Sequence, residues 1–174
     1  MKRKILLLTI VLLTVFTGVS AQENPNTGLQ RAEVKKVESL VGHWKGSGWI
    51  QQGAKRETFT GTETVQRKLD GLALLVEGKF TNAEGKVIHE TLAVLDFNEK
   101  DSKYRFRTYL ASGRSGEYEL KLVSDGYEWG FQSPMGTVRY TIKMTSDVWF
   151  ETGEFSKDGK TWIKFFEMKL DKVK

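Results

Sequence analysis

The sequence predicts an all-β protein, a ten-stranded antiparallel up-and-down β-barrel with one short N-terminal helix. From about residue 43 onward, apolar residues recur at every second position, which is the period of a strand with one buried face. Nine turn signals, such as Asp70-Gly71 and Asp158-Gly159, separate these runs. A meander of this length has two unprotected edges unless it closes, so we expect a barrel. A β-sandwich is the alternative, but it usually needs longer crossing connections.

The N-terminus has the features of a secretory signal peptide. Basic residues at positions 2 to 4 precede an apolar run over 5–16, which is shorter than the roughly 20 residues that a membrane-spanning helix needs. Small residues then lead to Ala21, after which we expect cleavage. The prediction is a signal peptide over 1–21 and a secreted or periplasmic mature protein without a stable membrane anchor. An uncleaved anchor is the alternative.

Cysteine content and charge exclude several classes of protein. The chain has no cysteine, which excludes a lipoprotein, disulfides, thiol nucleophiles and thiolate metal sites. Three of the 27 basic residues and none of the 22 acidic ones lie in the predicted signal, so the mature charge is 24 minus 22, or +2. The remaining charges alternate along the chain, which argues against nucleic acid as a partner.

Behind the predicted signal, we expect a flexible leader over 22–32 and one barrel domain over 33–174. The leader prediction rests on Pro25, Gly28 and their polar neighbours. Val34, Val37, Leu40 and Val41 then share one face of a helix, which predicts a short amphipathic helix from residue 33.

The strands follow the turn signals, and alternation gives their inner faces. Tyr118 alternates with charged residues in the sixth strand, and Trp129 and Tyr140 do the same in the next two. The ten predicted strands are 43–51, 56–68, 72–81, 87–97, 103–111, 115–123, 127–133, 137–144, 148–156 and 160–170. The aromatic residues predicted to face inward are Trp44, Phe59, Phe80, Tyr104, Phe106, Tyr118, Tyr127, Trp129, Phe131 and Tyr140. Trp44 is expected to plug the barrel floor.

Several motifs resemble those of small exported bacterial lipocalin-like proteins, a calycin-type barrel family of unknown function. The segment 40–48 contains a G-x-W-x-G-x-G pattern behind a short helix, 61–71 matches a G-T-x-T-V…L-D-G hairpin, and 95–97 is an L-D-F turn. A closing S-x-D-G-K-T-W hairpin occupies 156–162. The resemblance spans about residues 37 to 170 and implies a calycin fold, but it supplies no catalytic residues. Nitrobindin-like calycins bind haem through a histidine near the C-terminus, which this chain lacks, so we expect no cofactor.

The residue types needed for catalysis are scarce. The two histidines, His43 and His89, do not show metal-ligand spacing, and no nucleophile elbow or phosphate-binding loop occurs, so we predict neither a metal site nor catalytic residues. A small-molecule site usually combines an apolar lining with a few polar groups. The predicted ligand-binding residues are Glu63, His89, Phe106, Tyr118, Trp129, Phe131 and Tyr140.

What such a site could bind depends on whether Glu63, and the arginines Arg105 and Arg107, point into the barrel or toward solvent. If Glu63 points inward, burial requires it to be paired, hydrogen-bonded or protonated; an outward Glu63 is the alternative. Arg105 and Arg107 are expected to face outward, because inward arginines would instead indicate an anionic amphiphile.

Three functions are compatible with these observations. The first is binding of a small hydrophobic molecule inside the barrel. The second is a structural or partner-binding module with a filled interior, and the third is a cavity enzyme, an isomerase or hydrolase, in which Glu63 and His89 would converge.

Overall fold

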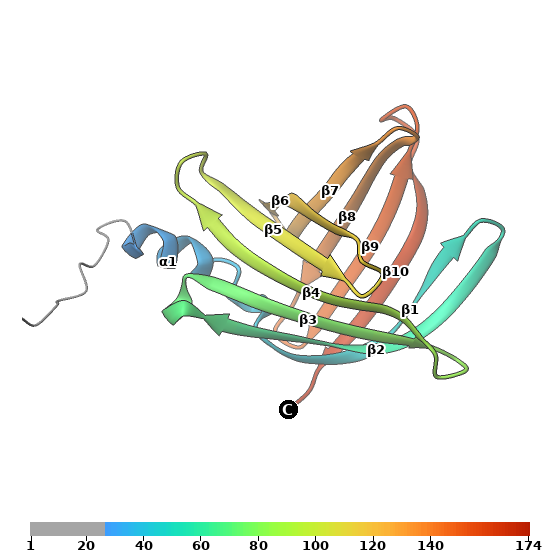
Figure 1. The fold of residues 1–174 in the computed structure, drawn as a ribbon, viewed down its shortest axis with the longest axis horizontal. Coiled ribbons are helices and arrows are strands. Elements are labelled where there is room, and N and C mark those ends of the chain that lie inside the picture. Colours follow the sequence, from blue (N-terminus) through green and yellow to red (C-terminus); the bar gives the residue numbers. More distant parts are fainter. Residues whose placement is uncertain (1–26) are drawn as a thin grey trace, which may run out of the picture.

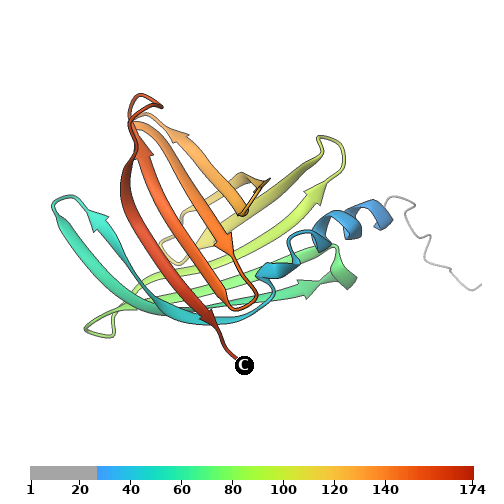
Figure 2. The same cartoon turned by 180° about the vertical axis from the view of Figure 1, so that it is seen from behind.

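The protein is a closed antiparallel β-barrel of ten strands, β1 to β10 in chain order around the barrel, with β1 pairing with β10 (Figures 1 and 2). The computed structural model describes residues 27–174, so the predicted signal peptide and its cleavage site lie outside the described residues. No helix in 27–174 is long and apolar enough to cross a membrane. The all-β barrel predicted from the sequence is confirmed.

Nine of the ten strands begin and end within one residue of their predicted bounds. The strands are β1 (Gly42–Gln52), β2 (Lys55–Lys68), β3 (Ala73–Asn82), β4 (Val87–Asn98), β5 (Lys103–Leu110), β6 (Ser115–Val123), β7 (Gly126–Ser133), β8 (Gly136–Met144), β9 (Val148–Ser156) and β10 (Ile163–Lys172).

The tenth strand starts three residues later than predicted, at Ile163. The Oδ1 atom of Asp158 accepts hydrogen bonds from the backbone N–H groups of Lys160 and Thr161, each at 2.8 Å, and holds these residues in the turn. These hydrogen bonds hold the pKa of the Asp158 carboxyl at about 2. The late start therefore follows from an aspartate-stabilised turn that alternation does not detect.

The N-terminal helix also differs from its prediction. The helix α1 (Thr27–Lys35) begins within the segment expected to be a flexible leader, because Leu29, Gln30, Arg31 and Ala32 are good helix formers. After Lys35 the chain tightens into a turn and the short 3-10 helix η1 (Glu38–Leu40). The apolar face predicted for this segment is nevertheless correct, since Val34, Val37 and Leu40 are all buried.

This N-terminal segment closes one end of the barrel (Figures 1 and 2). The Trp44 indole Nε1–H donates to the Leu40 carbonyl at 2.8 Å, and Trp44 is fully buried, as expected of a floor residue. The Tyr104 hydroxyl donates to a Glu33 carboxylate oxygen at 2.7 Å. We call the half of the barrel next to these contacts the closed half. Its inward side chains include Val65, Leu74, Leu95, Leu170 and Trp44, each at most 2% exposed.

The opposite end, which we call the open half, lies toward the turns around residues 53, 84, 112, 134 and 159. Pairing of β1 with β10 stops at Ile50 and Phe166, and the β1–β2 hairpin then leaves the barrel wall (Figures 1 and 2). Pairing of β6 with β7 covers only Leu120–Val123 and Gly126–Trp129, at the closed end of these strands. The wall is therefore looser toward the open end.

The outer face carries the arginines whose orientation was in question. Arg105 and Arg107 both form ion pairs with Asp96 on β4, at 3.3 and 3.1 Å, and Arg107 also pairs with Glu117 on β6 at 2.8 Å. Their neighbour Phe106 faces inward, with its ring centroid 5.4 Å from that of Trp129. The outward orientation of both arginines is confirmed, and the anionic amphiphile that inward arginines would have indicated loses its support.

Candidate functional site

The candidate site is the barrel interior, where strand pairing brings together the aromatic residues predicted from alternation. Trp129 on β7 pairs with Tyr140 on β8, and their rings stack with centroids 4.2 Å apart and planes 8° apart. Tyr118 lies 5.3 Å from Trp129 and 5.6 Å from Phe131 between ring centroids. Phe106, Tyr118, Trp129, Phe131 and Tyr140 thus form one cluster, which we call the aromatic wall.

The aromatic wall is only partly covered, in contrast to the closed half. Trp44 in the closed half is 0% exposed, whereas Phe131 is 38% exposed although it faces the interior. Phe106, Tyr118, Trp129 and Tyr140 are half-buried. Inward aromatic rings that keep accessible surface can be reached from the open end of the barrel, whereas those of the closed half cannot.

A β-bulge in β10 adds two further rings to this region. The register with β9 shifts between Lys164 and Phe166. Consequently the neighbouring Phe165 and Phe166 both contact Tyr140, at 5.7 and 5.8 Å between ring centroids, although alternation would place them on opposite faces. Gly153 on β9 leaves the room for these rings, because a Cβ atom there would lie 2.9 Å from atoms of both Phe166 and Tyr140.

Glu63 points into the barrel from β2. It pairs with Trp44 on one side and with Gly78 of β3 on the other. A Cβ atom at position 78 would lie 2.5 Å from Glu63 Oε1, so the glycine provides the space that the carboxyl group occupies. Oε2 is buried and has no hydrogen-bond partner among the described residues, although Glu63 as a whole keeps some accessible surface inside the barrel. Of the two orientations considered for Glu63, the inward one is correct.

A second interior carboxyl group, Glu151 on β9, was missed from the sequence. The Trp129 and Trp149 indole N–H groups donate to its two oxygens, at 3.3 and 3.2 Å. Glu151 is 7% exposed and shares the inner face of its strand with Trp149 and Gly153. The spacing of two between Trp149, Glu151 and Gly153 was a signal available in the sequence, because it places the carboxyl on the aromatic side of the strand.

Burial shifts the pKa of both carboxyls upward. Desolvation, and secondarily the nearby negative charge of Glu151, raises the pKa of Glu63 to about 8. Desolvation also raises the pKa of Glu151 to about 7, while the two indole donors act in the opposite direction. Glu151 therefore loses its proton first, and Glu63 keeps its own at neutral pH.

The structure does not bring His89 to Glu63. His89 faces the open end of β4, where its ring lies 6.0 Å from that of Phe80 and bonds with the Thr91 hydroxyl. Partial desolvation and then the positive charge of Arg114 lower its pKa, although the residue remains exposed at the rim. His43 lies on β1, where its Nδ1 bonds with the hydroxyl of Thr64 at 3.2 Å. Among residues 27–174, no group of three potential metal ligands occurs.

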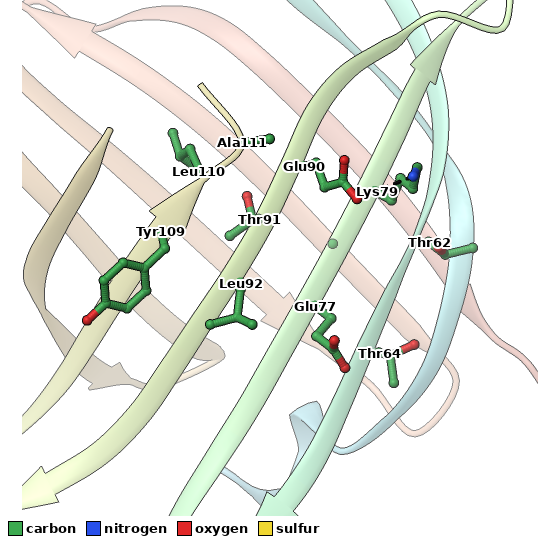
Figure 3. Close-up of a pocket in the computed structure, with 11 residues that line it drawn as sticks. Thr62, Thr64, Glu77, Lys79, Glu90, Thr91, Leu92, Tyr109, Leu110 and Ala111 are labelled. Atoms are coloured by element: carbon green, nitrogen blue, oxygen red, sulfur yellow. Dashed lines mark hydrogen bonds and ion pairs between the residues drawn. The ribbon is translucent and has the colours of Figure 1, made fainter. Parts of the chain in front are cut away.

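Two depressions on the outer face are less suited to a specific small ligand. One, of about 540 Å³, lies over β2 to β5; of its three charged residues, Lys79 and Glu90 pair with each other at 3.2 Å, and Glu77 is the third (Figure 3). Another, of about 340 Å³, lies over β6 to β8, where Arg139 stacks on Trp162 and pairs with Glu154. Both depressions are open to solvent, and their lining is largely polar or already engaged in ion pairs, so we place the candidate site in the interior.

Comparison with known proteins supports the fold. No family model and no curated protein sequence matches the chain. Among solved structures, Rv2717c from M. tuberculosis is similar with a TM-score of 0.61 and 12% identity, covering 81% of this chain and 97% of that one. The S-type phycobiliprotein lyase CPES from Guillardia theta is similar with a TM-score of 0.54 and 11% identity, covering 88% and 98%. The chain therefore has a calycin-like barrel fold.

Proposed function

We propose that this protein binds one small, largely apolar ligand in the open half of the barrel, against the aromatic wall. The observation that carries the proposal is the contrast in burial between the fully covered closed half and the partly exposed inward rings of the open half. An apolar lining with a few polar groups is the usual form of a small-molecule site. The name of one structural neighbour, a phycobiliprotein lyase, is compatible with a ligand-handling barrel.

The ligand is bound outside the cytoplasm in this proposal. That part rests on the sequence of residues 1–21 alone, with its basic start, short apolar run and small residues before the predicted cleavage site. The alternative is a filled barrel that binds a partner on its outer face. It is less well supported, because in a filled barrel the inward rings would cover one another and would keep no accessible surface.

The test is a fluorescence titration with the neutral apolar probe N-phenyl-1-naphthylamine. Phe106→Ala, which removes a ring of the aromatic wall, is expected to weaken binding about tenfold, in line with the roughly 1.5 kcal/mol or more that a buried aromatic contributes. Tyr109→Ala changes an outward residue of the same strand, three positions from Phe106 and 53% exposed, and should leave binding unchanged. Saturable 1:1 binding with this difference supports the proposal, and equal effects of the two variants contradict it.

A cavity enzyme is the second candidate, favoured by the interior carboxyl pair. With pKa values of about 8 and about 7, Glu63 can donate a proton while Glu151 accepts one near neutral pH. Native mass spectrometry of the purified protein identifies a bound ligand, which is then incubated in D₂O with each protein. Deuterium incorporation by the wild type, lost in Glu151→Gln, would support proton transfer, and equal incorporation would exclude a role for Glu151.

A further inference from the structure

The charges that face the barrel interior are unevenly distributed. In the described middle of the barrel, the inward ionisable groups with raised pKa are two acids, Glu63 and Glu151, and the tyrosine Tyr140. Lys172 lies at the closed end, with its Nζ 5.0 Å from the Trp44 ring centroid. Arg114 and His89 lie at the open end, and Arg114 acts electrostatically on both His89 and Tyr140. The centre of the interior therefore attracts positive charge.

Glu63 lacks the partners that a buried carboxyl normally has. In the described part of the chain its Oε2 is covered and makes no hydrogen bond, and no ion pair involves Glu63. A buried polar group without a partner costs on the order of 1 to 3 kcal/mol, so such a group in a folded protein needs an explanation. The glycine at position 78 makes this arrangement possible, because any side chain there would collide with the carboxyl.

Glu151, by contrast, is prepared to carry a negative charge. Two indole N–H groups, from Trp129 and Trp149, donate to its oxygens, and hydrogen bonds to the charged form stabilise that form. The negative charge that the pair carries near neutral pH therefore lies mainly on Glu151. Trp129 also belongs to the aromatic wall, so the charge lies at the edge of the proposed ligand site.

We propose that the ligand carries a basic nitrogen, as a protonated amine or amidine, and that this group is bound by the carboxyls of Glu63 and Glu151 while its apolar body contacts the aromatic wall. This inference rests on the proposed function, binding of a small apolar ligand in the same space. A cation compensates the buried charge of Glu151 and offers N–H donors to the unpartnered Glu63. The neighbouring rings of Trp129 and Tyr140 provide further stabilisation, since aromatic faces attract cations.

The experiment compares three probes that share one ring system and differ in charge: 2-naphthylmethylamine, 2-naphthylmethanol and 2-naphthoate. Isothermal titration calorimetry of the full protein at pH 7 is expected to show the amine binding at least tenfold more tightly than the alcohol, with the carboxylate weakest. In Glu151→Gln the preference for the amine should fall below threefold while the affinity for the alcohol is retained. Glu77→Gln, an exposed glutamate on β3, is the matched control and should behave as the wild type.

A second readout tests the role of Glu63. The cation lowers the pKa of the Glu63 carboxyl, so binding of the amine should release protons, measured by titration in two buffers of different ionisation enthalpy. Glu63→Gln should reduce this release to the part that comes from Glu151, whose pKa is about 7, and binding of the alcohol should release none. Absence of proton release from the wild type would overturn the assignment to Glu63.

The outcomes separate the two proposals. If the alcohol or the carboxylate binds as tightly as the amine, the inference of a cationic ligand is wrong, whereas the proposed apolar site stands. If none of the three probes binds, both proposals are contradicted. Retention of the full amine preference in Glu151→Gln, with the variant folded by circular dichroism, would exclude Glu151 as the anionic partner.

Discussion

Replacing Glu63 by glutamine should change the pH dependence of stability. The folded state raises the pKa of Glu63 from 4.5 to about 8, so between these values the folded protein binds a proton that the unfolded chain does not. The contribution of Glu63 to stability is therefore fully present below pH 4.5 and is lost as the pH rises toward 8. At 1.36 kcal/mol per pH unit, the loss between pH 4.5 and pH 7 is up to about 3 kcal/mol.

Glutamine has nearly the same size as glutamate but cannot ionise. The variant Glu63→Gln should therefore lose the pH dependence of stability that arises from Glu63. The free energy of unfolding of the variant, measured relative to the wild type, should increase by up to about 3 kcal/mol from pH 4.5 to pH 7. The dependence that arises from Glu151, whose pKa is also raised, remains in both proteins. The unfolding free energy of Glu63→Gln, relative to that of the wild type, is therefore expected to be highest at the highest pH of this range.

The measurement is urea unfolding at constant ionic strength at pH 4.5, 5.5, 6.5 and 7.5, followed by circular dichroism and tryptophan fluorescence. Glu77→Gln, on the outer face of β3, serves as the control and should run parallel to the wild type. If the Glu63→Gln and wild-type curves also run parallel, Glu63 is hydrated in the folded state and the argument from its burial fails.

Two further predictions concern packing. Gly78→Ala places a Cβ atom 2.5 Å from Glu63 Oε1 and should lower the unfolding free energy by about 1 to 3 kcal/mol, whereas Gly28→Ala, with nothing within 4 Å, should not lower it. Equal urea midpoints for the two variants would show that the carboxyl of Glu63 does not occupy the space over Gly78. Leu40→Ala should cost about 2 to 5 kcal/mol, because this side chain is 3% exposed in the closed half. Leu29→Ala, at a position 54% exposed, should change stability by less than about 0.5 kcal/mol; a similar loss in both would refute the closing role of the N-terminal segment.

Most of the strand arrangement could be predicted because its determinants are local. Alternation with period two places Tyr118, Trp129 and Tyr140 on one face without any knowledge of neighbouring strands. Turn residues such as Asp70 and Gly71, which both adopt positive φ, mark where each strand must end. The start of α1 at Thr27 is not evident from composition, because Pro25 just before the helix and Gly28 in its first turn are typical of a loop, while the helix formers follow from Leu29.

The candidate site was only half predictable. Glu63 was identified with its orientation left open, and Glu151 was missed although Trp149 and Gly153 share its face. Even with both residues known, their proximity could not be derived from the sequence. The strands β2 and β9 come to lie near each other, with β1 and β10 between them, only when β1 pairs with β10 and closes the barrel.

The sequence by itself therefore determined the ten strands, their inner faces and the apolar character of the interior, since these follow from spacing between near neighbours in the chain. Tertiary structure decided what the interior can do chemically. Closure of the barrel removes Glu63 and Glu151 from water and places them within electrostatic reach of each other. It also gives hydrogen-bond donors to Glu151 alone, and this difference in surroundings keeps the pKa of Glu151 below that of Glu63.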